Sequence, residues 1–520
     1  MALIKSISVV SGLTLVSRFF GFFRDVLLAR FLGVSLAADC FFVAFKLPNF
    51  FRRLFAEGAF SAAFVPIFCG ILGPGDSDIQ KAAARGFAEA TLALLLPFLL
   101  IFTALMQTFM PWTLIVIAPG FIDEPGKYDL AVEFTRATFP YLMLISLVSL
   151  LSGVLSGLNR FSAAAAAPVL LNLTLILSLI FFHETQIMTG RALSRAVTIA
   201  GVIQLFWLII AVSRSGMPLR LSWPRITPQM KELFRVMLHA IVGAGAIQIN
   251  LVIDIILASF LPEGSLSYLF YADRLNQLPI GVIGVAVGTV LLPTLSRMLA
   301  GGELGKANNA QNRAVETALL LTLPAALALI IIPMPLISVL FERGAFTAAA
   351  TNNTAMALMA YAAGLPAYVL IKVLVPGFYA RKDTLTPMKI GIATVVINTV
   401  LNIILMIPLQ HVGLALATAI SAWVNAGLLF FYLWRRDHFQ LDSRLKQRVL
   451  RIVISTAFMG ALLAWGAGFA DPWFKGDLVT KIAAILFLVL GGIISYGLAA
   501  IITGAVKGSE VAGVMKRERK

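Results

Sequence analysis

Charged side chains lie inside one of the most apolar segments of the chain. Residues 17–33 read SRFFGFFRDVLLARFLG, so that Arg18, Arg24 and Asp25 stand among phenylalanines and leucines. A charged side chain at the middle of a lipid bilayer costs about 2.5–3.5 kcal/mol on insertion scales. Charges kept in such a segment are therefore expected to face protein or water and to mark a functional site.

Two other apolar segments carry more charges, which are Asp39, Lys46, Arg52, Arg53, Glu57, Asp273 and Arg274. Together with the first three they make six cations and four anions, a surplus of two positive charges. If all of them faced lipid, the cost would be on the order of 20 kcal/mol, so they must share an interior. The planar guanidinium fork matches phosphate oxygens in pairs. We therefore predict a site for a phosphate-bearing substrate that is moved through the membrane.

Helical geometry places the charges of the first segment on two neighbouring stripes. At about 100° per residue, Arg18 and Arg24 are about 120° apart, with Gly21 midway between them. A ligand can approach a glycine backbone closely, so two guanidiniums would flank a strip of accessible backbone. Ser17 shares the stripe of Arg24, and Asp25 shares that of Arg18, which we expect it to orient.

The second charged segment combines an ion pair with a proline. Arg53 and Glu57 have i,i+4 spacing and are predicted to pair. Pro48 is expected to interrupt the helix just before Arg52, which frees backbone groups that a lined cavity can satisfy. The alternative for the whole cluster is structural ion pairing, with Arg30 and Arg53 extending from helix ends to the membrane surface.

A separate constellation of oxygen-bearing side chains suggests a cation site. Asp254 lies in one apolar segment, Asn398 and Asn402 lie at i,i+4 in a second, and Thr418 lies in a third. Oxygen ligands from three helices suit a hard cation such as sodium. The alternative is a hydrogen-bonded polar contact between helices, which needs no ion.

No motif for a nucleotide or a resident metal is found in the sequence. It lacks a G-x-x-x-x-G-K-[ST] phosphate loop, so ATP is not expected to drive transport. Its four histidines are scattered, and Cys40 and Cys69 lie in apolar contexts typical of small buried side chains. Asp76 and Asp78 suit a solvated turn better than the metal site of a transferase. We expect no enzyme activity and no cofactor, with sodium or the membrane potential as candidate driving forces.

The elements that must position these residues are membrane-spanning helices. Hydrophobic residues make up 59% of the 520 residues and charged residues 13%, and the mean hydropathy is +0.92. Soluble proteins have about 25% charged residues. Apolar runs of about 20 residues, each long enough to cross a bilayer, recur along the chain. We predict an all-α protein with fourteen spans, at 7–33, 37–71, 86–117, 131–157, 163–183, 192–213, 234–261, 267–298, 313–341, 352–380, 388–408, 412–434, 449–470 and 480–504.

The basic residues predict which side of the membrane each loop occupies. One set of loops holds Arg214, Arg220, Arg225, Lys231, Arg235, Arg381, Lys382, Arg435, Arg436, Arg444, Lys446 and Arg448, and the tail ends in MKRERK. The opposite loops, 118–130, 184–190 and 471–479, contain few. Both termini are therefore expected in the cytoplasm. The net charge of +16 is explained by this asymmetry, so nucleic acid is not expected as a partner.

Similar motifs recur about 220–230 residues apart. AFKLPN at 44–49 resembles ADRLNQLP at 272–279, and SGLNRF at 156–161 resembles PGFYAR at 376–381. Parallel halves of this kind are a transporter architecture in which the site lies between the halves. We predict lobes at 1–215 and 233–436, a cytoplasmic linker at 216–232, and an added helix hairpin with a basic tail at 437–520. The alternative is chance resemblance between helices that contain proline.

Four motifs resemble the MurJ (MviN) family of lipid II flippases, and the resemblance extends over residues 1–505. They are SRFFGFFRD, AADCFFVAFKLPNFFRRLFAEGAFSAAFVPIF, YADRLNQLPIGVIGVAVGTVLLPTLS and VLVPGFYARKDTLTPMKI. The family belongs to a superfamily that also holds multidrug and toxin extruders and polysaccharide flippases.

The resemblance implies two six-helix lobes in a V shape and a C-terminal helix pair that forms a lipid-facing groove. It implies export of the undecaprenyl-pyrophosphate-linked peptidoglycan precursor across the bacterial cytoplasmic membrane by alternating access. Membrane lipids and cell-wall synthesis proteins are the implied partners. The implied functional charges are Arg18, Arg24, Asp39, Arg52, Glu57 and Arg274. The implied sodium-site positions are Asp254, Asn398, Asn402 and Thr418.

Three other functions compete with this hypothesis. A flippase for another undecaprenyl-linked glycan fits the charges nearly as well. A drug or cation antiporter of the same superfamily should line its cavity with acidic and aromatic residues rather than with six cations. A membrane-embedded glycosyltransferase or phosphatase would need a convergent acid–base or metal group, and the sequence shows none.

Overall fold

The computed structural model describes residues 2–53, 60–73 and 77–506; the side chains of 2–7, 239–247, 285–287 and 289 are also left undescribed. Nearly all of these described residues are helical, and no strand occurs among them. Nine of the described helices are long and apolar enough to cross a membrane. The prediction of an all-helical, multi-pass membrane protein is confirmed, while the count of fourteen spans stays a prediction.

Helix contacts divide the chain into two compact units, residues 1–267 with 343–346, and residues 268–342 with 347–520. This division assigns residues 233–267 to the first unit, whereas the sequence repeat places them in the second lobe. The helix α10 (Pro228–Ser259) packs against the helices α3 (Ser61–Leu72) and η2 (Pro119–Asp123) of the first unit. Because packing does not test a repeat, the predicted lobes and linker stay predictions.

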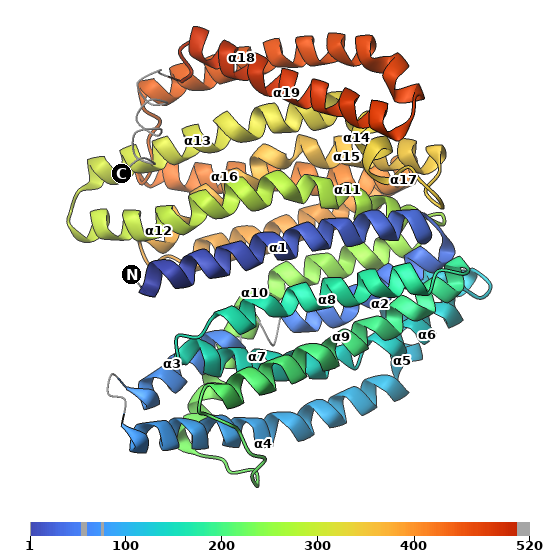
Figure 1. The fold of residues 1–520 in the computed structure, drawn as a ribbon. Coiled ribbons are helices and arrows are strands. Elements are labelled where there is room, and N and C mark those ends of the chain that lie inside the picture. Colours follow the sequence, from blue (N-terminus) through green and yellow to red (C-terminus); the bar gives the residue numbers. More distant parts are fainter. Residues whose placement is uncertain (1, 54–59, 74–76, 507–520) are drawn as a thin grey trace. The chain divides into compact units, whose positions relative to one another are not determined.

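The first unit holds the helices that carry the N-terminal charges (Figure 1). They are α1 (Ala2–Phe31), α2 (Leu36–Phe51), α3 (Ser61–Leu72), α4 (Asp78–Thr108), α5 (Met110–Ile117), η2 (Pro119–Asp123), α6 (Lys127–Thr138), α7 (Tyr141–Gly157), α8 (Ser162–Phe181), α9 (Gln186–Arg214) and α10. Among them, the span formed by α6 and α7 is the most enclosed, since 83% of its apolar window is buried.

The second unit begins within α11 (Ser265–Pro279) and ends with two helices drawn in red in Figure 1. The helices that follow α11 are η3 (Ile280–Gly284), α12 (Val285–Ala300), α13 (Leu304–Ile331), α14 (Pro333–Phe341), α15 (Ala348–Ala363), α16 (Leu365–Tyr379), α17 (Leu385–Arg435), η4 (Asp471–Lys475) and the two red helices, α18 (Ser443–Ala470) and α19 (Leu478–Ile502). Only 22% of the apolar window of α19 is buried, which is the pattern of a helix that faces lipid.

Short polar side chains begin many of these helices. Ser35, Thr185, Thr347 and Asp477 have extended backbones, and each accepts a hydrogen bond from the backbone N–H three residues later. Such caps satisfy N–H groups that the first helical turn leaves without partners. The helix boundaries thus follow from local sequence.

The helix α17 contains a break that separates two predicted spans. Gln410 has φ 49° and ψ −129°, which no helix accommodates, and Pro408 precedes it. A side chain at Gly413 would collide with the carbonyl of Leu405 across this bend. The chain therefore turns back almost without a loop, between the spans expected at 388–408 and 412–434.

Candidate functional site

The arginine Arg24 is buried between α1 and α8. Its Nε and Nη2 donate to Asp25 Oδ1 at 3.0 and 2.6 Å, and its Nη1 donates to Asn172 Oδ1 at 2.8 Å. Its guanidinium carbon also lies 5.8 Å from the centre of the Phe45 ring. Arg24 is only 6% exposed and Asp25 only 3%. These contacts use three of the five guanidinium N–H groups, so two remain for an anion.

Asp25 forms an ion pair with Arg24, its neighbour in the sequence. Stripe geometry measured at the backbone does not predict this pair, because the long arginine side chain folds across to the next residue. The orientation of Arg18 by Asp25 stays a prediction.

Asn172 is a site residue that the sequence analysis missed. It is 7% exposed in the middle of α8, and its Nδ2 donates to the carbonyl oxygen of Ser17 at 3.1 Å. A carbonyl only accepts hydrogen bonds, so this contact turns the amide oxygen of Asn172 towards Arg24. A Cβ at Gly21 would lie 3.5 Å from the same amide. An asparagine in an otherwise apolar span was the available signal.

The other predicted cations of the first unit differ in exposure. Arg18 and Arg53 are exposed, and Lys46 and Arg52 are half-buried. The helix α2 contains Pro48 within it and ends at Phe51, and residues 52–53 continue it as a π-helical turn, so the chain stays helical at Arg52. The predicted partner of Arg53, Glu57, lies outside the described residues. Pairing between them stays a prediction.

Asp39 is held by the backbone that leads into α11. Its carboxylate accepts from the N–H of Gly264 at 2.8 Å, and from the N–H and hydroxyl of Ser267 at 3.0 and 2.7 Å. Only 1% of Asp39 is exposed. These bonds give it a positioning role in this structure, and contact with a substrate stays a prediction.

Lys127, which the sequence analysis treated as a loop residue, is fully buried beside Asp39. Its Nζ lies 3.6 Å from Asp39, 2.9 Å from Glu124 and 4.4 Å from the centre of the Phe121 ring. A lysine inside protein needs such counter-ions. Its partner Asp39 lies far away in sequence, so no local pattern reveals the pair.

The predicted residues Asp273 and Arg274 lie in the second unit. The guanidinium of Arg274 lies 4.6 Å from the centre of the Phe270 ring, and Asp273 accepts a hydrogen bond from Gln277. Stacking on an aromatic ring holds the plane of the guanidinium in place. The convergence of Arg274 with the cations of α1 stays a prediction.

The asparagines predicted for a sodium site form a hydrogen-bonded chain. Asn402 Nδ2 donates to Asn398 Oδ1 at 2.9 Å, and Asn398 Nδ2 donates to Ser421 Oγ at 3.0 Å. Thr418 donates to the carbonyl of Leu414, one turn earlier. These contacts within α17 match the alternative of a polar contact between helices.

Asp254, the fourth predicted ligand, lies in the first unit and accepts a hydrogen bond from Asn250 at 3.3 Å. No cluster of three or more histidine, cysteine, aspartate or glutamate side chains suited to a metal occurs in the part of the chain searched. Sodium, which amide and hydroxyl oxygens also bind, stays a proposal.

The turn between α16 and α17 carries a strong surface ion pair. Asp383 lies 2.7 Å from Arg436 and caps the backbone N–H of Thr386 at 2.9 Å. Burial alone would raise the pKa of Asp383, but hydrogen bonds from Thr386 and the charge of Arg436 outweigh it and lower the pKa to about 2. This carboxylate is therefore charged throughout the physiological pH range.

Comparisons with known proteins agree over most of the chain. The family model described as lipid II flippase MurJ matches residues 28–503. A probable lipid II flippase MurJ of Rhizobium tropici is 43% identical, with 100% of this chain and 98% of that protein covered. The lipid II flippase MurJ of Burkholderia cenocepacia is 35% identical, with 90% of each covered.

Solved structures give the same picture. A lipid II flippase MurJ in an inward closed conformation matches with a TM-score of 0.78 and 26% identity, over 94% of this chain and 98% of that one. An inward-facing multidrug transporter of the MATE family matches with a TM-score of 0.67 and 16% identity, over 83% of this chain and 98% of that one. The second similarity shows a shared fold alone.

Proposed function

This chain belongs to the MurJ family of lipid II flippases, and we propose from this premise that it moves lipid II from the inner to the outer leaflet of the inner membrane. The observation that carries the proposal is the similarity over nearly the whole chain, at 43% identity to one flippase. The substrate is then the lipid-linked peptidoglycan precursor, and the protein acts as a transporter and not as an enzyme.

The arginine site supplies chemistry that suits this substrate. A pyrophosphate carries about two negative charges, which the surplus of two positive charges among the predicted site residues would balance. Arg24 keeps two N–H groups for it while Asp25 and Asn172 hold the guanidinium in place. Contacts from Arg18, Arg52 and Arg274 would complete the site.

Alternating access explains how the head group crosses while the lipid tail stays in the bilayer. Rocking of one lobe against the other would open the site first to one side and then to the other. Each elementary charge moved across the membrane is worth about 2.3 kcal/mol per 100 mV, so the membrane potential could contribute. Fourteen spans with both termini in the cytoplasm complete this proposal.

The test is complementation of bacteria depleted of their own flippase, with a leaflet-specific assay of lipid II. The wild-type chain should restore lipid II in the outer leaflet, and Arg24→Ala should not, at equal membrane levels. Arg195→Ala, which removes an exposed arginine of α9, is the matched control and should behave as wild type. Activity of Arg24→Ala would remove Arg24 from the site. Failure of the wild type would favour another undecaprenyl-linked glycan.

A further inference from the structure

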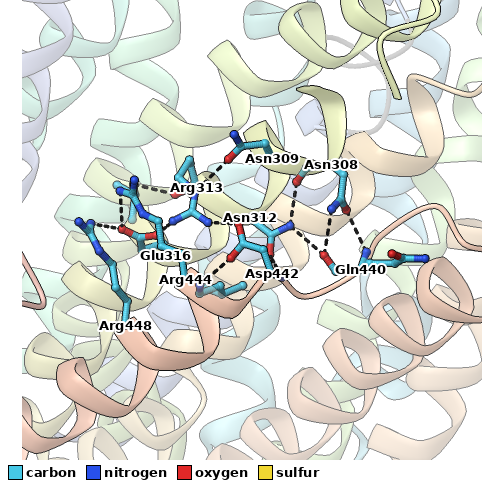
Figure 2. A network of polar contacts seen from close by, with 11 residues as sticks. Asn308, Asn309, Asn312, Arg313, Glu316, Gln440, Asp442, Arg444 and Arg448 are labelled. Carbon is cyan, nitrogen blue, oxygen red and sulfur yellow. Dashed lines mark hydrogen bonds and ion pairs between the residues drawn. The ribbon is translucent and has the colours of Figure 1, made fainter. Parts of the chain in front are cut away.

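A polar network joins α13 to the start of α18 (Figure 2). Its centre is Glu316, which is 5% exposed and accepts from three arginines. Arg313 and Arg448 form ion pairs with its two oxygens, and Arg444 lies 3.4 Å away. Arg448 is itself 6% exposed. One buried carboxylate thus holds guanidiniums from both helices.

Two asparagines of α13 bind the backbone of the connection that precedes α18. Asn308 accepts from the N–H of Gln440 at 2.9 Å and donates to its carbonyl at 3.1 Å. Asn312 donates to the same carbonyl at 2.9 Å and accepts from the N–H of Asp442 at 3.1 Å. Figure 2 shows both amides facing this stretch of backbone.

Asp442 completes the network and also starts α18. One of its oxygens accepts from the N–H of Leu445 at 2.6 Å, which caps the helix, and the other pairs with Arg313 of α13. The first turn of α18 is therefore tied to α13 through the same side chain that defines where α18 begins.

Beyond the network, few polar groups hold the hairpin formed by α18 and α19. The hydroxyl of Tyr496 donates to the carbonyl of Leu320 at 2.7 Å, and Gly460 lets α18 approach Leu327 closely. The remaining contacts named among buried residues are apolar, and lipid is as apolar as those side chains. Apolar packing therefore gives little preference for the docked position inside a membrane.

The hairpin and its tail occupy residues 437–520, about 16% of the chain. An element of this size needs a specific attachment to keep one position in a lipid bilayer.

We propose that the network is a lock that fixes the hairpin α18–α19 to α13, and that Glu316 is the residue on which the lock depends. Glu316 is the carboxylate that contacts all three arginines. Without its charge, Arg448 is left buried beside a weaker acceptor, and the connection at 437–442 keeps its asparagine contacts, the ion pair of Asp442 with Arg313 and the hydrogen bond from Arg381 to the carbonyl of His438. The hairpin then separates from α13 more often, and the second unit loses its fixed lipid-facing edge.

Trypsin measures this separation directly, because Arg444, Lys446 and Arg448 are cleavage sites within the locked segment. The full chain is placed in lipid nanodiscs, where both faces are accessible. Glu316→Gln should raise the cleavage rate in 444–448 by about tenfold or more, since cleavage follows the population of the open form. Cleavage at Arg297, which is exposed near the end of α12, reports whether the rest of the second unit stays folded.

Two further variants keep the test decisive. Glu303→Gln breaks an exposed ion pair with Lys306 on the same helix and should leave cleavage unchanged. Asn308→Ala removes only the contacts to Gln440 and should give a smaller increase, even if Glu316→Gln does not fold. Unchanged cleavage in 444–448 in both Glu316→Gln and Asn308→Ala would overturn the lock.

The consequence for transport rests on the proposed function, in which the hairpin guides the lipid tail. Glu316→Gln should then lower lipid II in the outer leaflet while its membrane level is maintained. Faster cleavage with unchanged transport would keep the lock and refute this consequence. Failure of the wild-type chain to transport lipid II would refute the proposed function and leave the cleavage result standing.

Discussion

The site around Arg24 and the network around Glu316 combine buried charges in opposite ways. At Arg24, one guanidinium has one carboxylate and one neutral amide, all from the first unit. At Glu316, one carboxylate collects three guanidiniums. The first arrangement leaves N–H groups for an outside anion, and the second directs its cations at a fixed internal acceptor. Burial and charge alone therefore do not distinguish a ligand site from a structural joint; the partners do.

The largest expected effect comes from comparing one variant of each region, Arg24→Ala and Arg448→Ala, in the same two assays. Arg24→Ala should abolish thermal stabilisation by a lipid pyrophosphate, while it leaves cleavage at 444–448 unchanged. Arg448→Ala should raise cleavage at Arg444 and Lys446 while it leaves the stabilisation by the lipid unchanged, and it should destabilise the second unit by about 1.5–3 kcal/mol because Glu316 loses one of its three arginines. The measurement is thermal unfolding with and without the lipid. Equal effects of both variants on stabilisation by the lipid would contradict the distinction between a ligand site at Arg24 and a structural network at Glu316.

A smaller effect is expected at the interface of Glu316 with Arg448. The double variant Glu316→Gln/Arg448→Met should be less destabilised than the sum of its single variants, because it leaves no buried charge behind. A coupling free energy of about 1–3 kcal/mol is expected from a double-mutant cycle in nanodiscs. Additive single variants would mean that the two side chains do not act together.

A variant of Asn172 tests the Arg24 site. Asn172→Ala should lower transport about tenfold, since a hydrogen bond to a charged group contributes about 1.5–3 kcal/mol. Substrate affinity should fall together with a moderate decrease in thermal stability, because the hydrogen bond to Arg24 exists without substrate and Arg24 keeps Asp25. Asn352→Ala, at an exposed asparagine of α15, is the control. A large loss of stability with unchanged affinity would make Asn172 a packing residue only.

The smallest effect concerns a surface ion pair, as a reference for both buried regions. The pKa of Asp383 is lowered from 3.8 to about 2 in the folded protein, so its contribution is present above pH 4 and is lost as the pH falls to 2. Asp383→Asn should therefore flatten the decline in thermal stability over that interval. An identical acid profile for the variant and the wild type would contradict the assignment.

The sequence predicts well whatever depends on neighbouring residues. Apolar runs predict the helices, and short polar residues such as Ser35 mark where many begin. Arg24 was identified because a charge in an apolar run has an energetic meaning by itself. Its partner Asn172 is 148 residues away, and Arg448 is 132 residues from Glu316, so these pairs depend on tertiary packing. The ion pair of Asp25 with Arg24 was missed for a related reason, because packing sets the side-chain conformers.

The asparagines of α13 hold main-chain atoms of the connection rather than its side chains. Gln440 can therefore be replaced by any residue except proline, since all of these offer the same backbone N–H and carbonyl. The number of residues between the end of α17 and Asp442 has no such freedom, because one extra residue would shift the helix cap past Arg313. In related chains, we expect the amino-acid sequence of this connection to vary and its length to be constant.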